Sequence, residues 1–550
     1  MTKEVLIEGH NTTRHDGGVA LQLPADGGIV AIATERIDRK KHSGNSQTAY
    51  DFARERYESE SSQFGTELDH FDPNYNKNQE LSHHKGHAAA AYYSSGYESS
   101  AVVVIDGQGP HSEPGQYTST SIWKGQGDKL ELVDINAEKG YSSQSLGLLY
   151  SAVTYHLGFG FLQEGKTMGL APYGKRTEMH DFLKRYVLVK GDSYEIDPNF
   201  IEALFYSNDG RKFFHWEERK QTTRSEKLMS EILQKIGSPR KSDGPITQRD
   251  MDLAWAVQSV LEESVLATMN RAKIATGCER VCYAGGVALN SSTNGKIIES
   301  NIFKDVFILP PAGDDGQALG RLLYRKHQLQ IQNQFSPFVM DHAYLGPQYI
   351  EEEIEEAIKN NGHVITSQKL EEEDLIKQTA GLVADGKVIS WWQGRSEIGP
   401  RALGNRSIVA NPSSEAMRDH INFNVKHREW FRPLAPSTIE EASGDIFRLD
   451  RPLPYMLAVV DVNKKYRDSL RAITHVDNSA RVQTVNAHQN RRYHKLIIEV
   501  GQKTGIPVVL NTSFNDNGEP LVESPQNAIR SFLNMKVDNL ILGDHLISKK

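Results

Sequence analysis

Cysteine is scarce in this chain: Cys278 and Cys282 are the two cysteines among 550 residues. Two cysteines are too few for a disulfide framework, and their CxxxC spacing matches neither the CxxC redox motif nor a zinc knuckle. We therefore expect both side chains to be small apolar residues of the core.

Long apolar segments are also lacking. No run approaches the ~20 residues that a membrane-spanning helix needs, and the mean hydropathy is -0.53. The N-terminal sequence MTKEVLIEGHNTTRHDGG has no apolar segment of the kind that a secretory signal carries. These features predict a cytoplasmic protein with no membrane partner.

An excess of positive charge is missing as well, because the formal net charge is -8. A negative protein has no general attraction to nucleic acid or to an anionic membrane. We expect no nucleic-acid partner, and any basic patch must be local.

The chain is long enough for at least two domains. Residues 3 to 36 predict three strands (VLIEG, GVALQL and IVAIATE) joined by turns. The pattern recurs from residue 101 as AVVVIDG, TSTSIW and LELVDINA. Two such meanders, each followed by helices, suggest the duplicated fold of the actin, sugar-kinase and chaperone-ATPase superfamily, in which nucleotide lies between the halves.

Helices and strands alternate further along the chain. A long amphipathic pattern, MDLAWAVQSVLEESVLATMNRAKIATG, predicts a helix with a glycine at its end. Strand RVCYAGG, helix VALNSSTNGKIIES, strand VFILPPAG and helix GQALGRLLYRKHQL follow, which indicates a parallel, buried part of a sheet. The pattern lapses between residues 330 and 347, where we expect a domain junction. Helix IEEEIEEAIKN and strands KVISWWQG and VVLN then predict a second α/β domain.

A histidine pair opens the segment SHHKGHAAAAYYSSG. On a helix His83 and His87 face the same way, the usual geometry for two ligands of one metal, whereas His84 points aside. Asp106 and Asp314 each follow a predicted strand. Two histidines and two aspartates suit Fe(II), Mn(II) or Zn(II) and leave positions open for substrate. A polar helix face for the histidines, and cap or turn roles for the aspartates, are the alternatives.

Two glycine-rich segments are candidate nucleotide-binding loops. AGGVALN follows a strand and opens a helix, so the backbone at Gly286, together with Asn290, could approach a phosphate or an adenosine closely. The expected loop QEGKTMGLAPYG offers Gly165 and Lys166 as phosphate partners. A plain surface loop explains the second segment equally well.

The first expected turn, HNTTRHDGG, contains His10, His15 and Asp16. Histidine titrates near neutral pH and suits general-base catalysis, which makes His15 a candidate catalytic residue. A solvated turn is the alternative.

Arginine is concentrated between residues 394 and 433, a stretch that contains Arg395, Arg401, Arg406, Lys426, Arg428 and Arg432. The planar guanidinium group binds phosphate oxygens two at a time. Arg428 and Arg432 are four positions apart and could converge on one anion. A salt-bridged surface, with Glu397 and Glu429 as partners, is the alternative. Further polar residues expected to line a nucleotide cleft are Arg481, Asn511 and Ser513.

These motifs together resemble the NodU/CmcH-type O-carbamoyltransferases, whose N-terminal half is similar to the tRNA threonylcarbamoyl-transfer protein of the actin-like superfamily. The matching motifs in the first part are HDGGVA, ERIDRKKH, HHKGHAAAA, VVVIDGQG, EGKTMGLAPYG, AGGVALN and PPAGDDGQALG. Those in the second part are GRSEIGPRALGNRSI, KHREWFRPLAP, HVDNSARVQTV and LNTSFNDNGEPLVESP. They run in family order through nearly the whole chain, and HDGGVA departs from the more usual HDAS-type run.

The resemblance implies an α/β protein of two domains. Residues 1–340 would form an actin-like (duplicated ribonuclease-H-like) carbamoyl-transfer domain, and residues 341–550 a YrdC-like domain. The YrdC-like domain would make carbamoyl-adenylate from carbamoyl phosphate and ATP with Mg²⁺. The first domain would then transfer the carbamoyl group to a hydroxyl of a small-molecule secondary metabolite, such as an antibiotic precursor.

The resemblance also implies roles for particular residues. The metal ligands fall on His83, His87, Asp106 and Asp314, with Fe(II) as our first choice of metal, and His15 lies beside the acceptor hydroxyl. The adenylate would be held near Gly286 and Asn290. The acceptor and the oligomeric state stay open.

Two other functions remain as alternatives. One is tRNA modification of the threonylcarbamoyl type, against which the acidic balance argues. The other is a nucleotide-binding module on the same fold, without catalysis. The related hydrogenase-maturation carbamoyltransferase carries cysteine-rich zinc segments that a chain with two cysteines cannot supply.

Overall fold

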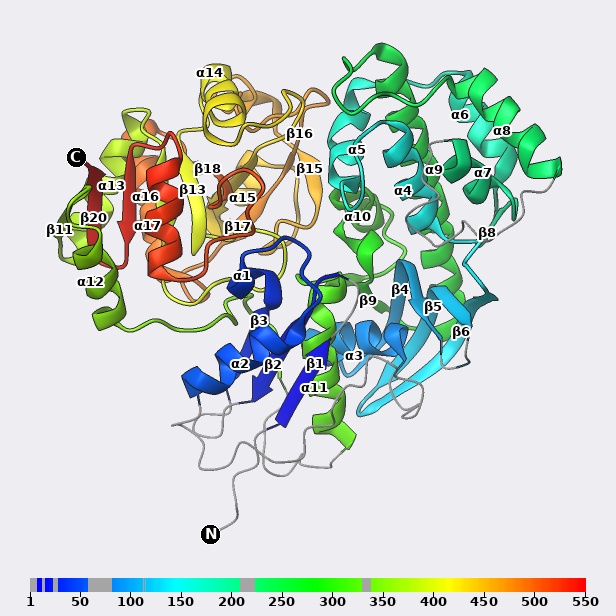
Figure 1. Ribbon diagram of the computed structural model, residues 1–550, viewed down its shortest axis with the longest axis horizontal. Coiled ribbons are helices and arrows are strands. Elements are labelled where there is room, and N and C mark those ends of the chain that lie inside the picture. Colours follow the sequence, from blue (N-terminus) through cyan, green and yellow to red (C-terminus); the bar gives the residue numbers. More distant parts are fainter. Residues whose placement is uncertain are drawn as a thin grey trace, which may run out of the picture. The chain divides into compact units, whose positions relative to one another are not determined.

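The structure is a computed structural model that describes residues 7–11, 15–22, 28–57, 82–111, 113, 115–207, 223–328 and 338–550. Contacts divide the chain into two compact units, one of residues 1–73 with 314–550 and one of residues 74–313. Figure 1 labels their helices and strands. These units are defined by contacts rather than by position along the chain, so the domain boundary at residue 340 stays a prediction.

The N-terminal meander is confirmed. Strands β1 (Ile7–Asn11), β2 (Gly18–Gln22) and β3 (Ile29–Ala33) form a three-stranded antiparallel sheet. Helix α1 (Thr34–Asp38) follows directly, and α2 (Ser46–Tyr57) buries its small residues Ala49 and Ala53 against the sheet.

The second meander and the parallel strands are confirmed in the unit of residues 74–313. The meander consists of β4 (Ser99–Pro110), β5 (Gln116–Gln126) and β6 (Lys129–Lys139), and the parallel pairs join β4 to β9 (Arg280–Ala284) and β9 to β10 (Asp305–Ile308). The sheet order is β10-β9-β4-β5-β6. Cys278 and Cys282 are both buried, as expected.

The described helices of residues 74–313 are α3 (His83–Ser95), α4 (Leu146–His156), α5 (Glu164–Leu170), α6 (Glu178–Tyr186), α7 (Phe200–Ser207), α8 (Thr223–Ile236), α9 (Gln248–Thr276) and α10 (Ser291–Glu299), with a hairpin of β7 (Val187–Lys190) and β8 (Ser193–Ile196). Three of these helices (α3, α4 and α9) pack on this sheet, and the other described helices of the unit pack against these helices or against one another. The long helix α9 was predicted, and it ends where Gly277 adopts the left-handed conformation with φ 66°.

The larger sheet of the other unit has eight strands in the order β11-β20-β19-β12-β13-β18-β14-β17. They are β11 (Ile365–Lys369), β12 (Ile389–Trp392), β13 (Arg406–Ala410), β14 (Ala435–Ile439), β17 (Gln483–Val485), β18 (Val508–Ser513), β19 (Asn539–Leu542) and β20 (His545–Lys549). A two-stranded ribbon joins β15 (Val459–Asp461) to β16 (Ser479–Arg481). The predicted second α/β domain is therefore present, and the mixed α/β fold class is confirmed.

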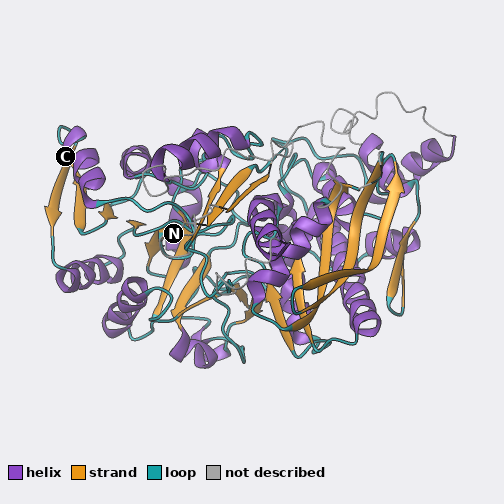
Figure 2. Ribbon diagram, turned by 90° about the horizontal axis from the view of Figure 1, so that it is seen from below, coloured by secondary structure: helices purple, strands orange, loops and turns teal. Residues whose placement is uncertain are grey.

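Helices cover both faces of the eight-stranded sheet. Successive apolar residues of a strand point to opposite faces, so each face needs a covering layer. Val508 and Leu510 of β18 belong to one core with residues of α12 (Glu351–Asn360) and α17 (Pro525–Asn534). Val509 belongs to a second core with residues of α13 (Glu372–Ala384) and α16 (Arg491–Thr504). Figure 2 shows these strands in orange and the helices in purple. The remaining helices of the unit are α11 (Gln317–Gln328), α14 (Glu415–Asp419) and α15 (Glu440–Ile446).

The N-terminal segment is bonded to the C-terminal part of its own unit. The backbone N–H of Ala31 donates to the carbonyl of Leu345 at 2.7 Å, and the Arg36 side chain donates to the carbonyl of Gly399 at 2.8 Å. No helix within the described ranges is both long enough and apolar enough to cross a lipid bilayer.

The predicted loop QEGKTMGLAPYG is wrong, because α5 and a 3₁₀ turn, Ala171–Tyr173, occupy most of it. Buried Met168 and Leu170 anchor this helix, and Thr167 Oγ1 lies 2.8 Å from Thr154 Oγ1 of α4. Tertiary packing thus outweighs the low helix propensity of the glycines.

Candidate active site

Helix α3 starts at the histidine pair. The Ser82 hydroxyl accepts the N–H of Lys85 and caps the helix, which fixes the direction in which the first turn presents its side chains. His83 and His87 are buried one turn apart, and their Nε2 atoms lie 3.2 Å from each other. His84 points elsewhere and bonds through Nδ1 to the Ser121 hydroxyl at 2.9 Å.

Asp106 contributes a carboxylate to the same place. Its Oδ2 lies 3.0 Å from Nε2 of His83 and 3.8 Å from Nε2 of His87. Burial opposes ionisation, but the hydrogen bond from His83 and the charges of the histidines outweigh it and hold the pKa of Asp106 well below its usual value. The sequence predicted that the strand ends before Asp106, and this is wrong. Strand β4 continues to Pro110, and its pairing with β5 shifts register after Ile105.

Glycines let the backbone approach these ligands. A Cβ at Gly109 would lie 2.1 Å from Cδ2 of His83. Gly285 has φ 92°, and a Cβ there would lie 2.3 Å from the Ile105 carbonyl oxygen. This turn brings the N–H of Gly286 to 3.0 Å from Oδ1 of Asp106, so the second oxygen of the carboxylate is oriented by the backbone.

The donor set of His83, His87 and Asp106 fits a divalent metal ion. Their ligand atoms lie within 4.8 Å of one another. Two imidazoles and one carboxylate are the ligands found at many Fe(II) sites with open positions, and Zn(II) accepts them too. The hydrogen bond from Gly286 to Asp106 is the kind of supporting contact that orients a ligand.

Asn290 has a structural role at the start of α10. Its side-chain oxygen accepts the N–H of Thr293 at 3.0 Å and so caps the helix. Its amide nitrogen donates to Gln258 at 2.9 Å. Gly286 is therefore the residue of the AGGVALN turn that contacts Asp106.

The neighbouring residues Gly165 and Lys166 lie in the first turn of α5. Gly165 is exposed, and the ammonium group of Lys166 lies over the Phe159 ring, 5.8 Å from its centroid. A phosphate-binding role for this pair stays a prediction.

His15 and Asp314 lie in the other unit. His15 Nδ1 is 2.9 Å from Oδ2 of Asp16 and 3.9 Å from Oδ2 of Asp314. Oδ1 of Asp16 is 2.8 Å from Nδ1 of His42. Burial opposes ionisation of Asp16, but the hydrogen bonds from His15 and His42 outweigh it and hold the pKa of Asp16 well below its usual value. Burial lowers the pKa of His42, but the hydrogen bond to the Asp16 carboxylate outweighs burial and raises it overall. The sequence predicts no role for His42, although His42 ends the motif ERIDRKKH.

Four arginines of this unit lie close enough to perturb one another. Burial lowers the pKa of Arg481 well below its usual value, and the positive charges of Arg401, Arg428 and Arg432 lower it further. Burial and the charge of Arg432 lower the pKa of Arg428 to about 9. Among the described residues, Nε of Arg481 and one terminal nitrogen of Arg428 are buried with no hydrogen-bond partner. This guanidinium cluster, Arg401, Arg428, Arg432 and Arg481, has the donors and the charge for an anion.

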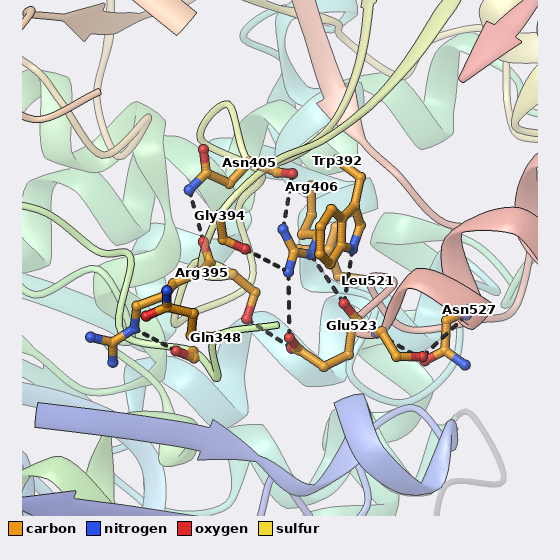
Figure 3. A network of polar contacts seen from close by, with 12 residues as sticks. Gln348, Trp392, Gly394, Arg395, Asn405, Arg406, Leu521, Glu523 and Asn527 are labelled. Carbon is orange, nitrogen blue, oxygen red and sulfur yellow. Dashed lines mark hydrogen bonds and ion pairs between the residues drawn. The ribbon is translucent and has the colours of Figure 1, made fainter. Parts of the chain in front are cut away.

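Two other arginines of the same stretch are saturated by the protein. Arg395 donates to the carbonyls of Gly346 and Leu345 at 2.7 and 2.8 Å. Arg406 is fully buried, with its guanidinium 4.0 Å from the centre of the Trp392 ring. Figure 3 shows it between this ring and Glu523, 3.7 Å away. These bonds tie Arg395 to the surrounding backbone, and an anion-binding role for Arg395 stays a prediction.

The polar residues of β18 are engaged as well. The side-chain amide of Asn511 donates to the Ser437 hydroxyl and to Oε1 of the Gln483 side chain, both at 3.0 Å. Lys426 Nζ donates to the carbonyl of Ser513 at 2.9 Å and to Oδ1 of Asn515 at 2.7 Å. Asn511 thus ties β18 to β14 and β17, whereas Lys426 holds Ser513 and the turn after β18.

Within the described ranges, Glu397 pairs with backbone N–H groups and forms no salt bridge with an arginine, which was the alternative interpretation. One of its oxygens accepts the backbone N–H groups of Leu403, Asn405 and Arg406 at 2.7, 2.8 and 3.1 Å. The carboxylate therefore organises the loop that carries Arg401. The charges of Glu429 and Asp315 act on the guanidinium cluster, but burial still lowers the pKa of Arg401, Arg428 and Arg432.

Comparisons with known proteins agree with the motifs. The family models described as Carbamoyltransferase N-terminus and Carbamoyltransferase C-terminus match residues 71–323 and 380–549. The chain is 36% identical to Nodulation protein NolO of Bradyrhizobium diazoefficiens over 86% of this chain and 79% of that protein. It is 38% identical to the uncharacterized protein sll1178 of Synechocystis over 85% of this chain and 75% of that protein.

A solved structure is also similar in part. Full-length HypF in the phosphate- and nucleotide-bound form aligns over 61% of this chain and 57% of its own, with 13% identity and a TM-score of 0.32.

Proposed function

Because the chain belongs to the carbamoyltransferase family and is an enzyme of that class, we propose that it forms carbamoyl-adenylate from carbamoyl phosphate and ATP and transfers the carbamoyl group to a hydroxyl. The acceptor in this proposal is a hydroxyl-bearing small molecule, such as a secondary metabolite. We assign adenylate formation to residues 341–550 and carbamoyl transfer to residues 1–340.

The guanidinium cluster carries the proposal. Carbamoyl phosphate and the ATP triphosphate together bring several negative charges, and a protein with net charge -8 must concentrate positive charge to hold them. Arg428 and Arg481 have buried nitrogen atoms for which the described part of the chain supplies no hydrogen-bond partner. Unpaired buried donors are costly in the free protein, and an anion that accepts their hydrogen bonds removes the cost.

The proposed reaction has three steps. Water displaces phosphate from carbamoyl phosphate and leaves carbamate. A carbamate oxygen attacks the α-phosphorus of ATP, which breaks the bond to pyrophosphate and gives carbamoyl-adenylate. The acceptor oxygen then attacks the carbamoyl carbon, the bond to the AMP oxygen breaks, and AMP leaves with the electron pair. Carbamate is short-lived in water, so a site that excludes bulk water protects it.

His83, His87 and Asp106 would hold a divalent metal, with Fe(II) as first choice and Zn(II) or Mn(II) as alternatives. We assign the fourth ligand to Asp314 on the sequence resemblance alone. When bound, such an ion supplies Lewis acidity to a carbonyl or phosphoryl oxygen. His15 takes the proton of the acceptor hydroxyl, a contribution of on the order of 100-fold to 10,000-fold.

The test is incubation of the purified chain with carbamoyl phosphate and ATP. We expect carbamoyl-adenylate by mass spectrometry and exchange of labelled pyrophosphate into ATP that requires carbamoyl phosphate. Arg481→Met should slow this exchange by about 100-fold or more, because charge stabilisation at a transferring group commonly contributes that much. Arg448→Met is the matched control, since Arg448 is an exposed arginine of the same unit and should leave the exchange unchanged.

Two outcomes would contradict the proposal. ATP turnover that is the same with and without carbamoyl phosphate would indicate a nucleotide-binding module. Salt-sensitive binding of tRNA together with modification of its adenosine would indicate the threonylcarbamoyl-type activity instead.

A further inference from the structure

Asp16 stands between two imidazoles. Its Oδ2 lies 2.9 Å from Nδ1 of His15, and its Oδ1 lies 2.8 Å from Nδ1 of His42. Each oxygen of the carboxylate therefore faces a different ring. All three residues belong to the same compact unit.

The backbone holds this arrangement in an uncommon conformation. Asp16 has φ 58° and His42 has φ 56°, both in the left-handed region that residues with a side chain rarely adopt. The N–H of Gly17 donates to the carbonyl of Ser43 at 2.7 Å, which ties the two loops together. The N–H of His42 donates to Oε2 of Glu35 at 3.0 Å. Strain of this kind persists only where the surrounding contacts fix it, and here they fix the two rings on one carboxylate.

We propose that Asp16 is a positioning residue for His15 and that His42 positions Asp16 in turn. The inference rests on the proposed function, in which His15 accepts the proton of the acceptor hydroxyl. A carboxylate that accepts a hydrogen bond from Nδ1 fixes the imidazole tautomer with the proton on Nδ1 and the lone pair on Nε2. His15 then presents Nε2 as the base, in one orientation.

As the acceptor oxygen bonds to the carbamoyl carbon, its proton moves to Nε2 of His15, and the bond between that carbon and the AMP oxygen breaks. The Asp16 carboxylate stays ionised and stabilises the imidazolium that forms. His15 later releases the proton from Nε2 to solvent.

A cation is the competing explanation for this group. The ligand atoms of Asp16, Glu35 and His42 lie within 4.8 Å of one another. The hydrogen bonds favour positioning, because Asp16 accepts from both rings and Glu35 accepts from the backbone of His42. Chelation separates the two explanations.

The first test is nuclear magnetic resonance of the full chain with ¹⁵N-labelled histidine, in which His15 and His42 are assigned by their single variants. We expect both neutral rings to carry the proton on Nδ1. In Asp16→Asn we expect His15 to become a mixture of tautomers, while Asp51→Asn, an exposed aspartate of α2, leaves both rings as in the wild type. An unchanged His15 tautomer in Asp16→Asn would overturn the proposal, as would loss of the His42 signal on treatment with a chelator.

The second test uses rescue by a conservative variant. Asparagine places its amide nitrogen where Nδ1 of histidine lies and tolerates the left-handed conformation. His42→Asn should therefore keep the wild-type tautomer of His15, and His42→Ala should lose it. Equal His15 spectra in these two variants would overturn the role of His42.

The third test measures conversion of carbamoyl-adenylate to AMP with glycerol as the probe alcohol. Asp16→Asn should lower the rate at saturating glycerol by about 100-fold to 10,000-fold with little change in KM, because tautomer and orientation act on the chemical step. Equal rates in wild type and Asp16→Asn would overturn the proposal. Both chains should form carbamoyl-adenylate equally fast. A wild-type chain that forms none would refute the proposed function and leave the tautomer result intact.

Discussion

Arginines close together in the sequence serve opposite purposes in this protein. Arg395 and Arg406 give their donors to backbone carbonyls, so they are already satisfied without a ligand. Arg428 and Arg481 keep buried donors that no described residue satisfies. The sequence shows the excess of arginine, but it does not show which arginines bond to the backbone and which keep unpaired donors. The carbonyl groups that accept from Arg395 and Arg406 are placed by the fold, not by residue type.

At the same scale, the histidine pair makes a prediction about metal content. His87 is fully buried and its Nε2 faces both His83 and Asp106. His87→Ala removes one of three clustered ligands, so we expect metal affinity to fall by at least about 100-fold, since even supporting contacts commonly contribute 10- to 100-fold. Metal content per chain, measured by elemental mass spectrometry after dialysis, checks this.

The control for that experiment is His488→Ala, because the His488 side chain is 86% exposed. It should retain the wild-type metal content. If His87→Ala and the wild-type chain held equal amounts of metal, the three residues would not be the ligands.

Among the elements, regular patterns are predictable and local exceptions are not. Both meanders, the parallel strands and the long helix α9 follow from alternation, turn residues and apolar spacing. Helix α5 was not predicted, because its glycines are typical of a loop. The helix forms because Met168 and Leu170 are buried in the core. The register shift near Asp106 was also missed, because it depends on pairing with β5, which no single strand encodes.

The turn after β9 makes a prediction at this scale. Gly285→Ala puts a Cβ 2.3 Å from a backbone oxygen at a residue with φ 92°. We expect it to destabilise the unit by about 1–3 kcal/mol and to weaken metal binding, because the N–H of Gly286 moves away from Asp106. Chemical denaturation and metal titration of the full chain measure the two effects.

Gly277→Ala is the matched control for the turn. Gly277 also has a positive φ, 66°, but a Cβ there meets nothing within 4 Å. Its cost should be about 1 kcal/mol with no change in metal affinity. Equal effects of both variants on metal binding would show that the turn does not orient Asp106.

At the scale of the whole molecule, residues 1–73 and 314–550 form one unit although about 240 positions separate them along the chain. Arg56 pairs with Glu353 at 2.7 Å, and Arg39 donates to the carbonyl of Pro520 at 2.9 Å. The lapse in the sequence pattern predicts a junction between residues 330 and 347, and the boundary at residue 340 stays a prediction. The sequence has no signal for contacts that join the first helices to the last turns.

The same unit contains the guanidinium cluster, which makes a prediction for the stability of the whole chain. Like charges that are buried together destabilise the free protein, as the lowered pKa of Arg481 reflects. Arg481→Met should therefore raise the stability of the ligand-free chain by about 0.5–2 kcal/mol, the range typical when a functional strain is removed.

An anion should reverse that ranking. Pyrophosphate should bind the folded wild-type chain and stabilise it by about 2.7 kcal/mol at a hundred times its Kd, and Arg481→Met should lose most of this gain because its cluster is incomplete. Thermal unfolding with pyrophosphate, compared with sodium chloride at equal ionic strength, measures both effects. If wild type and Arg481→Met gained equally from pyrophosphate, the arginines would not act as one anion site. If ligand-free Arg481→Met were also no more stable than the ligand-free wild type, groups of the protein itself would compensate the repulsion between the arginines.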